Sequence, residues 1–333
     1  MSPKKRRKAL ALLSGGLDST LAIKLMLDQG IMVEAISFVS PFCTYGNGGS
    51  CAAAVAASRL GVKLRLVSLG EEYLEVVKNP KYGYGKNMNP CIDCRIFMLK
   101  KAREYADEIG ADFIVTGEVL GQRPKSQHLN ALTLIERESG LRGRLLRPLS
   151  AKLLAETEVE QRGLVKRELL LDIHGRSRRR QMDLAETLGI VDYPCPAGGC
   201  LLTDPIFCTK LKDLIKHEET LDLRSISLLK VGRQFRYGPN KIVVGRNREE
   251  NRLLLELKSP EDLYLEVPEY GSPITLLLGP ESEEAIKVAA SITARYSDAP
   301  QKRIEVKYGR KNLEISIIVS PSQDRDMAKM RVG

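Results

Sequence analysis

The first informative feature of the sequence is a short apolar strand that is followed at once by a glycine-containing loop. Residues 8–13 are apolar enough to form a buried parallel strand. The next segment carries glycines, hydroxyl groups and one carboxylate: Ser14, Gly15, Gly16, Asp18, Ser19 and Thr20. Glycine lets the backbone approach an anion closely, and the N-terminus of the helix expected next directs N–H groups at it. The sequence therefore predicts a phosphate-binding loop, in which Asp18 either binds a metal ion or only shapes the loop.

Strands and helical segments alternate through the first half of the chain. We expect strands over 33–38, 63–69 and 112–116, helices over 52–60 and 94–109, a fifth element over 131–135, and a polar loop over 70–90 that covers the site as a lid. This alternation predicts an α/β fold with a Rossmann-like parallel sheet, whose strand-to-helix loops share one edge.

The second half has a different pattern. Short strands are expected over 241–244, 253–257, 263–267, 274–278, 304–307 and 313–319, with one helix over 282–296. These elements predict a smaller α+β domain. The expected division is a catalytic domain over 1–192, a cysteine-bearing connector over 193–225 and an α+β RNA-binding domain over 226–333.

Seven cysteines in a chain with no recognisable export signal point to thiol, metal or cluster chemistry rather than to a disulfide framework. Cys91 and Cys94 form a Cys-x-x-Cys pair at the start of a predicted helix, where the helix dipole favours thiolate. Three explanations stay open: a [4Fe–4S] cluster held by three cysteines, a zinc ion completed by a fourth cysteine, or a sulfur relay that closes a disulfide between Cys94 and Cys200.

The charge of the chain suits a polyanionic partner. Lys and Arg number 52 against 42 Asp and Glu, a net charge of +10. The densest basic cluster consists of Arg176, Arg178, Arg179 and Arg180, which either contact RNA phosphates or form a solvated helix face. No apolar run is long enough to span a membrane, so a membrane partner is not expected and a cytoplasmic location is.

Three motifs together resemble the catalytic domain of the tRNA 4-thiouridine synthetases and the related tRNA 2-thiouridylases, within the ATP pyrophosphatase (PP-loop) superfamily. They are the phosphate loop, Asn89 to Cys94, and the stretch from Thr116 to Gln127. The resemblance implies the adenine nucleotide α-hydrolase type of fold, with ATP and Mg²⁺ at the phosphate loop and with Phe38, Thr116 and Gly117 as further nucleotide contacts. It also implies a [4Fe–4S] cluster on Cys91, Cys94 and Cys200, with Cys195 as the rival for the third place. These three cysteines and Asp18 are then the catalytic residues.

A second resemblance covers roughly residues 244–306. Arg246 and Asn247, together with the segments 260–264 and 294–297, are similar to the C-terminal RNA-binding module of ribosome quality-control (NFACT-type) factors. The resemblance implies that this domain binds RNA and that Arg246 and Asn247 contact it.

Both resemblances lead to one expected function: ATP-dependent thiolation of a tRNA uridine, giving 4-thiouridine at tRNA position eight. The uridine oxygen is adenylated and sulfur then replaces it, supplied by sulfide or by a cysteine desulfurase or persulfide carrier. The alternatives are 2-thiouridine at the wobble position and a non-catalytic RNA-binding factor. The resemblance also allows a homodimer.

Overall fold

The computed structural model describes residues 7–43, 48–190, 193 and 199–333. The chain divides into two compact units, Met1–Thr203 and Asp204–Gly333. The sequence-based division instead placed boundaries at residues 192 and 225. Residues 205–217 and 223–229 are helices of the second unit, so the later part of the expected connector belongs to that unit.

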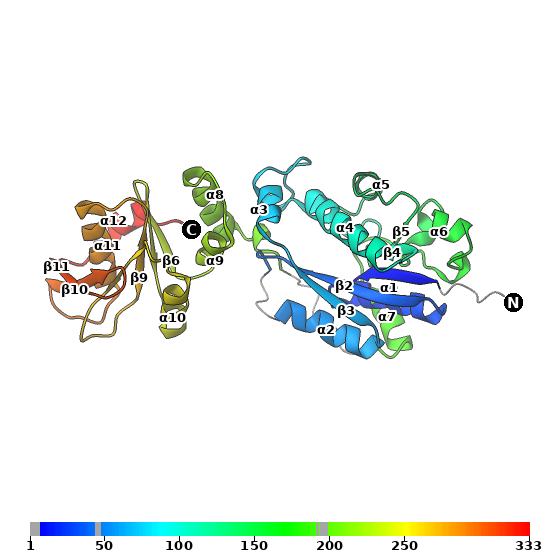
Figure 1. Ribbon diagram of the computed structural model, residues 1–333, viewed down its shortest axis with the longest axis horizontal. Coiled ribbons are helices and arrows are strands. Elements are labelled where there is room, and N and C mark those ends of the chain that lie inside the picture. Colours follow the sequence, from blue (N-terminus) through cyan, green and yellow to red (C-terminus); the bar gives the residue numbers. More distant parts are fainter. Residues whose placement is uncertain (1–6, 44–47, 191–192, 194–198) are drawn as a thin grey trace. The chain divides into compact units, whose positions relative to one another are not determined.

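A five-stranded parallel sheet forms the centre of the first unit, as the alternating pattern predicts (Figure 1). Its strands, in the spatial order β3-β2-β1-β4-β5, are β3 (Lys63–Ser68), β2 (Met32–Val39), β1 (Lys8–Leu12), β4 (Phe113–Val115) and β5 (Leu145–Leu146). All four pairings are parallel. The prediction of a Rossmann-like parallel sheet is confirmed.

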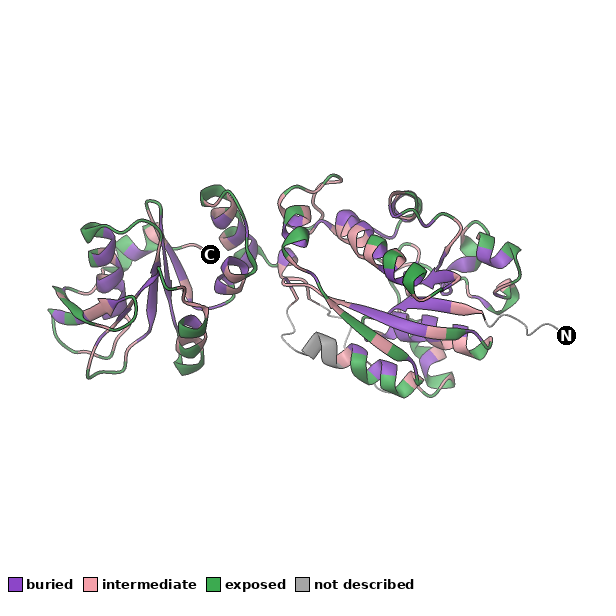
Figure 2. Cartoon of the chain, in the orientation of Figure 1, coloured by how far each residue is buried: buried purple, intermediate pink, exposed green. Residues whose placement is uncertain are grey.

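Helices cover both faces of this sheet. The α-helices of the unit are α1 (Leu17–Asp28), α2 (Gly48–Leu60), α3 (Glu71–Lys78), α4 (Cys91–Glu108), α5 (Leu129–Glu138), α6 (Glu158–Gln161) and α7 (Arg179–Thr187). Ala9 and Ala11 of β1 pack towards α1 and α2, whereas Leu10 and Leu12 pack towards α4 and α5. The central strands β1, β2 and β4 carry some of the most buried stretches of the unit (Figure 2), because their alternate side chains enter two different cores, whereas the edge strand β3 is largely exposed.

The strand order creates a switch point beside β1. The chain moves from β1 to β2 on one side, and β4 joins the sheet on the other side of β1. The loops that follow β1 and β4 therefore leave the same edge of the sheet in opposite directions. In open α/β sheets, ligands bind in the crevice at such a point.

The second unit contains a six-stranded antiparallel sheet. Its strands, in the order β11-β10-β8-β9-β7-β6, are β11 (Ile315–Val319), β10 (Ile304–Gly309), β8 (Leu263–Glu266), β9 (Thr275–Leu278), β7 (Asn240–Val244) and β6 (Arg233–Tyr237). Its helices are α8 (Pro205–His217), α9 (Leu223–Leu229), α10 (Arg248–Leu257), α11 (Glu283–Arg295) and α12 (Asp324–Met330). α11 packs on one face of the sheet and α9 and α10 pack on the other. The predicted α+β character of this region is confirmed.

Several element predictions were wrong. Residues 253–257 lie in helix α10 rather than in a strand, because Asn247 caps a helix there and only Leu254 among its leucines is fully buried. Residues 71–78 of the expected loop form α3. The element expected over 131–135, whose type was left open, is part of helix α5. Strand β6 was not predicted.

Among the described residues, every helix is too short or too polar to cross a lipid bilayer.

Candidate active site at the carboxyl ends of β1 and β4

The loop after β1 has the geometry of an anion-binding turn. Gly15 has φ +78°, and a Cβ there would lie 2.5 Å from the backbone carbon of Ala52, so only glycine fits. The hydroxyls of Ser19 and Thr20 donate to the carbonyl of Gly16 at 2.9 and 3.0 Å, which holds the turn in place. Gly16 caps α1 without a side-chain hydrogen bond. The N–H groups at the start of α1 are thus available to a phosphate.

Asp18 combines one satisfied and one unsatisfied carboxylate oxygen. Its Oδ2 accepts a hydrogen bond from Nε2 of Gln122 at 3.1 Å, while its Oδ1 is shielded from solvent and has no hydrogen-bond partner among the described residues. An unpaired buried carboxylate oxygen is costly unless a ligand completes it. Beside a phosphate loop, the hard oxygen ligand that Mg²⁺ requires fits this position.

The loop after β4, which carries Thr116 and Gly117, touches the phosphate loop, and nucleotide contact by these two residues stays a prediction. A Cβ on Gly117 would lie 2.5 Å from the backbone of Asp18 and Ser19, so the two loops meet backbone to backbone. Thr116 is buried and donates from Oγ1 to Glu118 at 3.2 Å. Phe38 is half-buried at the end of β2 and packs against the core on the α4 side. Its contact with a nucleotide stays a prediction.

A buried carboxylate holds the β4 loop in position. Glu118 is 2% exposed and forms ion pairs with Arg95 at 3.1 Å and with Arg147 at 3.0 Å. Burial alone would raise the pKa of Glu118, but the two guanidinium groups lower it below the ordinary value. The role of Glu118 as an anchor between α4 and β5 was not predicted, because nothing local in the sequence links it to Arg95 and Arg147.

Arg123, on the loop after β4, places a positive charge within electrostatic range of both Asp18 and Cys91. Its side chain is exposed, and its guanidinium makes no hydrogen bond or ion pair among the described residues. Partial desolvation of the guanidinium by the neighbouring loops and the charge of Arg95 lower the pKa of Arg123, while Cys91, Glu118 and Asp18 raise it. Arg123 is therefore an uncompensated cation within electrostatic range of Asp18 and Cys91. The sequence analysis did not single it out.

Cysteines from separate segments gather at this edge of the sheet. Cys91 opens α4, as expected, and its thiol donates to Oδ1 of Asn89 at 3.1 Å. Tyr73, which is buried on α3, donates from its hydroxyl to Sγ of Cys94 at 3.0 Å. Cys200 lies within electrostatic range of Cys94, Cys43 and Cys91, in that order of strength. The structure thus brings the three predicted cysteines together and adds Cys43, which sequence reasoning had left without a role.

The thiols are held in their neutral form. Burial raises the pKa of Cys91 and of Cys94, and raises that of Cys200 to about 12. The predicted preference for thiolate at the start of α4 is thus outweighed by burial. Buried neutral thiols are inert unless a metal or another partner makes the thiolate favourable.

The cysteine group has the right chemistry for a soft metal or a cluster, because thiolates are the ligands that zinc and iron–sulfur centres take. Over the described ranges, however, no three His, Cys, Asp or Glu side chains stand in a ligating arrangement. Cys195, the rival third ligand, lies outside the described residues.

The predicted basic cluster lies next to the β4 loop. His174 pairs with Leu120 in a β-bridge, and the N–H of Gly175 donates to the carbonyl of Leu120 at 2.7 Å. Arg176, Arg179 and Arg180 are exposed, and Arg180 forms an ion pair with Asp172 at 2.5 Å. The position next to the site favours RNA contact, which stays a prediction.

The two predicted RNA contacts of the second unit have partners inside that unit. Oδ1 of Asn247 accepts from the N–H of Glu250 at 3.0 Å and caps α10. The guanidinium of Arg246 donates from Nε to Oε1 of Glu250 at 2.8 Å. Both residues therefore stabilise the start of α10, and RNA contact by them stays a prediction.

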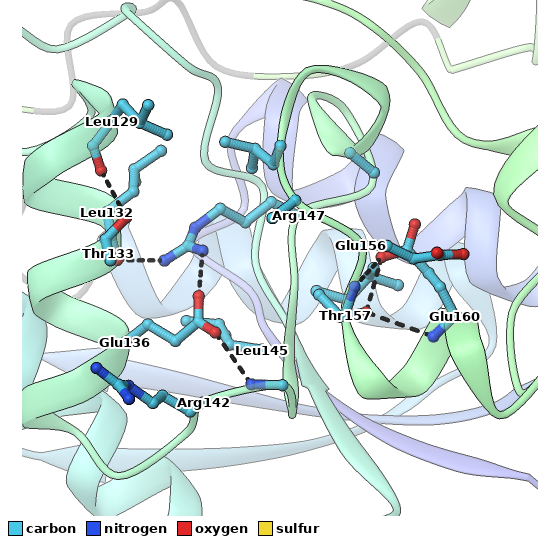
Figure 3. A pocket seen from close by; sticks show the side chains of 15 residues that line it. Leu129, Leu132, Thr133, Glu136, Arg142, Leu145, Arg147, Glu156, Thr157 and Glu160 are labelled. Atoms are coloured by element: carbon cyan, nitrogen blue, oxygen red, sulfur yellow. Dashed lines mark hydrogen bonds and ion pairs between the residues drawn. The ribbon is translucent and has the colours of Figure 1, made fainter.

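A cavity of about 330 Å³ lies elsewhere in the first unit, beyond the edge strand β5 (Figure 3). It is lined by residues of α5 and by residues between Arg142 and Glu160. The ion pair between Arg147 and Glu136 forms part of its wall. None of the phosphate-loop or cysteine residues lines it. The candidate site is instead the open edge formed by the loops after β1 and β4.

The sheet order, the phosphate loop and the unpaired carboxylate oxygen define the first unit as a nucleotide-binding α/β domain of the PP-loop class. Residues 5–153 match the family model described as Thiamine biosynthesis protein (ThiI). Residues 232–331 match the model of the NFACT protein RNA binding domain. Both predicted resemblances are confirmed: a region similar to the ThiI family is followed by a region similar to the NFACT-type RNA-binding domain.

Curated relatives match the first unit. The tRNA-specific 2-thiouridylase MnmA of Syntrophotalea carbinolica is 37% identical over 122 residues, which are 34% of this chain and 35% of the relative. The probable tRNA sulfurtransferase of Lysinibacillus sphaericus is 38% identical over 144 residues, which are 43% of this chain and 34% of the relative. The chain thus spans about a third of the length of these relatives.

Two solved structures are also similar. A 4-thiouridine synthetase–RNA complex with bound ATP has 26% identity and a TM-score of 0.37, covering 63% of this chain and 50% of that chain. The U34-tRNA thiolase NcsA from Methanococcus maripaludis, solved with its [4Fe-4S] cluster, has 20% identity and a TM-score of 0.34, covering 64% of this chain and 68% of that chain.

Proposed function

We propose that this protein is an ATP-dependent tRNA sulfurtransferase of the cytoplasm that makes 4-thiouridine at tRNA position eight. One observation carries the proposal: a phosphate loop with an unpaired buried oxygen on Asp18 shares one sheet edge with a group of cysteines. Activation by ATP and delivery of sulfur are the two requirements of uridine thiolation, and here their chemical groups are neighbours.

The first step is adenylation. A uridine carbonyl carbon is a poor target because oxide is a poor leaving group. The uridine oxygen attacks the α-phosphorus of ATP, and pyrophosphate leaves along the N–H groups at the start of α1. Mg²⁺ on Asp18 would screen the phosphate charge, and the uncompensated Arg123 would hold the negative phosphate of the adenylated base on its other side.

The second step replaces the activated oxygen with sulfur and releases AMP. Cys91, Cys94 and Cys200 are the residues that would hold the sulfur-bearing group. A [4Fe–4S] cluster on three thiolates would supply an iron position that accepts sulfide, either from solution or released from a persulfide carrier by a thiol reductant, and a zinc ion or a cysteine persulfide is the alternative. The hydroxyl of Tyr73 fixes the orientation of the Cys94 thiol at the base of the group.

Two features support tRNA as the substrate. The curated relatives of the first unit act on tRNA according to their names, and the second unit matches an RNA-binding family. Arg176 and Arg179 add exposed positive charge next to the β4 loop. We propose that tRNA phosphates contact these arginines, that the guanidinium of Arg246 adds a contact from the second unit, and that the enzyme works as a homodimer.

Nucleoside mass spectrometry tests the proposal. Unmodified tRNA is incubated with anaerobically purified, iron-reconstituted protein, ATP, Mg²⁺ and sulfide. We expect 4-thiouridine that disappears when ATP or iron is omitted, and that disappears in Cys94→Ala but not in Cys208→Ala, a change to a buried cysteine of the second unit. Absence of any thionucleoside, with tRNA binding and iron uptake verified, would contradict the proposal.

The same experiment decides the second candidate. The similarity to tRNA-specific 2-thiouridylases favours 2-thiouridine at the wobble uridine as the alternative product. Its mass spectrum equals that of 4-thiouridine, but its chromatographic retention and absorption differ. A product retained as 2-thiouridine would keep the two-step chemistry and move the target to the anticodon.

A further inference from the structure

Cys43 follows β2 and lies directly opposite Cys200. The two residues form an isolated antiparallel β-bridge, and the N–H of Leu201 donates to the carbonyl of Phe42 at 2.8 Å. A hydrogen bond between the residues that flank the bridge makes Cys43 and Cys200 a non-hydrogen-bonded pair. In such a pair the Cα atoms are about 4.5 Å apart and both side chains lie on the same face.

This spacing is suitable for a disulfide. Disulfides join residues whose Cα atoms are roughly 4.4–6.8 Å apart, so the bond needs no backbone rearrangement here. Both side chains are half-buried, and neither is part of a disulfide in the structure. The electrostatic contact between the two thiols agrees with the bridge.

We propose that Cys43 is a fourth thiol of the site and the residue with which Cys200 forms a reversible disulfide. The inference of the disulfide stands on the bridge alone, whereas its consequence for sulfur transfer rests on the proposed function. With a two-electron oxidant such as a diazene, two S–H bonds break, one S–S bond forms, and both hydrogens pass to the diazene to give a hydrazine. A dithiol reopens the bond by exchange.

Cys94 is the competing partner for Cys200. It lies on α4, has no backbone pairing with the Cys200 segment, and its sulfur accepts the Tyr73 hydrogen bond. A bond to Cys94 would therefore cost the Tyr73 contact, while a bond to Cys43 uses a spacing that the backbone already fixes. The bridge favours Cys43.

The consequence is a redox control of the site. While the disulfide is closed, Cys200 has no thiolate to bind a metal or to carry sulfur. Sulfur transfer is then switched off under oxidising conditions and restored by reduction, without a change in the phosphate loop.

Disulfide mapping tests the inference, and its design follows from the sequence. Trypsin leaves Cys43 and Cys51 on one peptide, and it leaves Cys195, Cys200 and Cys208 on another. To make each cross-link unambiguous, we use full-length protein in which Cys51, Cys195 and Cys208 are replaced by alanine. After treatment with diamide, we expect a cross-link between the Cys43 and Cys200 peptides that a dithiol removes. A Cys94–Cys200 link, or no link to Cys43, would overturn the inference.

A second measurement guards against a folding defect in the variants. The rate at which iodoacetamide alkylates Cys200 is measured in oxidised and in reduced wild-type protein. We expect this rate to be at least tenfold lower in the oxidised protein. Oxidised Cys43→Ala should alkylate as fast as reduced protein, and continued protection of Cys200 would identify Cys94 as the partner instead. Neither measurement needs ATP or tRNA, so failure of the disulfide and failure of the thiolation activity are distinguishable.

Discussion

The phosphate-loop edge of the first unit and the start of α10 in the second unit carry the same kinds of side chain in opposite states. Among the described residues, Asp18 keeps a buried carboxylate oxygen without a hydrogen-bond partner, and the guanidinium of Arg123 has no ion pair. Asn247 and Arg246 instead make hydrogen bonds to Glu250. Of these four residues, the sequence analysis predicted a functional role for Asp18, Arg246 and Asn247 but not for Arg123.

The difference separates binding from stability. A polar group whose hydrogen bonds are complete within the chain contributes to folding, while one that is left incomplete at the edge of a sheet is stabilised only when a ligand arrives. The contrast therefore predicts which substitutions change activity and which change the free energy of unfolding.

Glu118→Gln should give the largest effect, because it removes the buried charge that the buried Arg147 and the half-buried Arg95 share. We expect a loss of about 3–5 kcal/mol in the free energy of unfolding. Urea denaturation measures this, with Glu72→Gln as the control. Glu72 pairs with Lys101 at the surface, and its loss should cost at most about 1 kcal/mol. Equal losses in both variants would show that the site edge is not anchored by Glu118.

The pH dependence of stability follows from the same residue. The pKa of Glu118 is lowered in the folded protein, so its contribution is fully present above the ordinary carboxyl pKa near 4.5. It is lost as the pH falls through the lower folded value. Denaturation from pH 7 down to pH 3 should show a steeper loss of stability in the wild type than in Glu118→Gln.

Asp18→Asn should abolish activity without loss of stability. It keeps the hydrogen bond to Gln122 and removes the charge that the unpaired oxygen would offer to Mg²⁺. We expect tRNA-dependent pyrophosphate release to fall by about 10²–10³-fold, the usual cost of losing one electrostatic stabiliser of a transition state. The unfolding midpoint should not fall, and a large fall would assign Asp18 to the fold.

Gly117→Ala should weaken ATP binding through crowding. Its Cβ would lie 2.5 Å from the backbone of Asp18 and Ser19, so the phosphate loop must move. We expect the crowding to cost about 1–3 kcal/mol, mostly in the free energy of ATP binding. Calorimetry should then give an ATP dissociation constant that is at least fivefold higher than in the wild type. Gly70→Ala is the matched control, because nothing lies within 4 Å of a Cβ there.

Asn247→Ala should give the smallest effect, and on stability only. The change removes the side-chain cap of α10 and should lower the free energy of unfolding by about 1 kcal/mol. RNA affinity measured by fluorescence anisotropy should stay within twofold of wild type. A tenfold loss of affinity at unchanged stability would break the contrast between the two units and assign Asn247 to RNA contact.

The sequence predicted what local patterns encode. The apolar runs of β1 and β2 and the glycine-bearing turn before α1 are signals that a few neighbouring residues carry, and each appeared where expected. The prediction of a strand over 253–257 was wrong because a cluster of leucines has neither a clear helical nor a clear strand period. The hydrogen bond by which Asn247 caps α10 favours the helix.

The site was predictable only in part. Asp18, Cys91 and Cys94 belong to recognisable motifs. Glu118, Arg123 and Cys43 acquire their roles from partners that are distant in the chain, such as Arg147 for Glu118 and Cys200 for Cys43. No pattern within one segment reveals such pairs, because the sheet order brings them together only in the folded protein.

The strand order also sets the sequence in which the site can assemble during synthesis. β1 emerges from the ribosome first, yet its loop lacks a neighbour until β4 is available to bring Gly117 against Asp18. Cys200, at the end of the first unit, completes the cysteine group last. A nascent chain can therefore bring the loops after β1 and β4 together well before Cys200 joins the other cysteines.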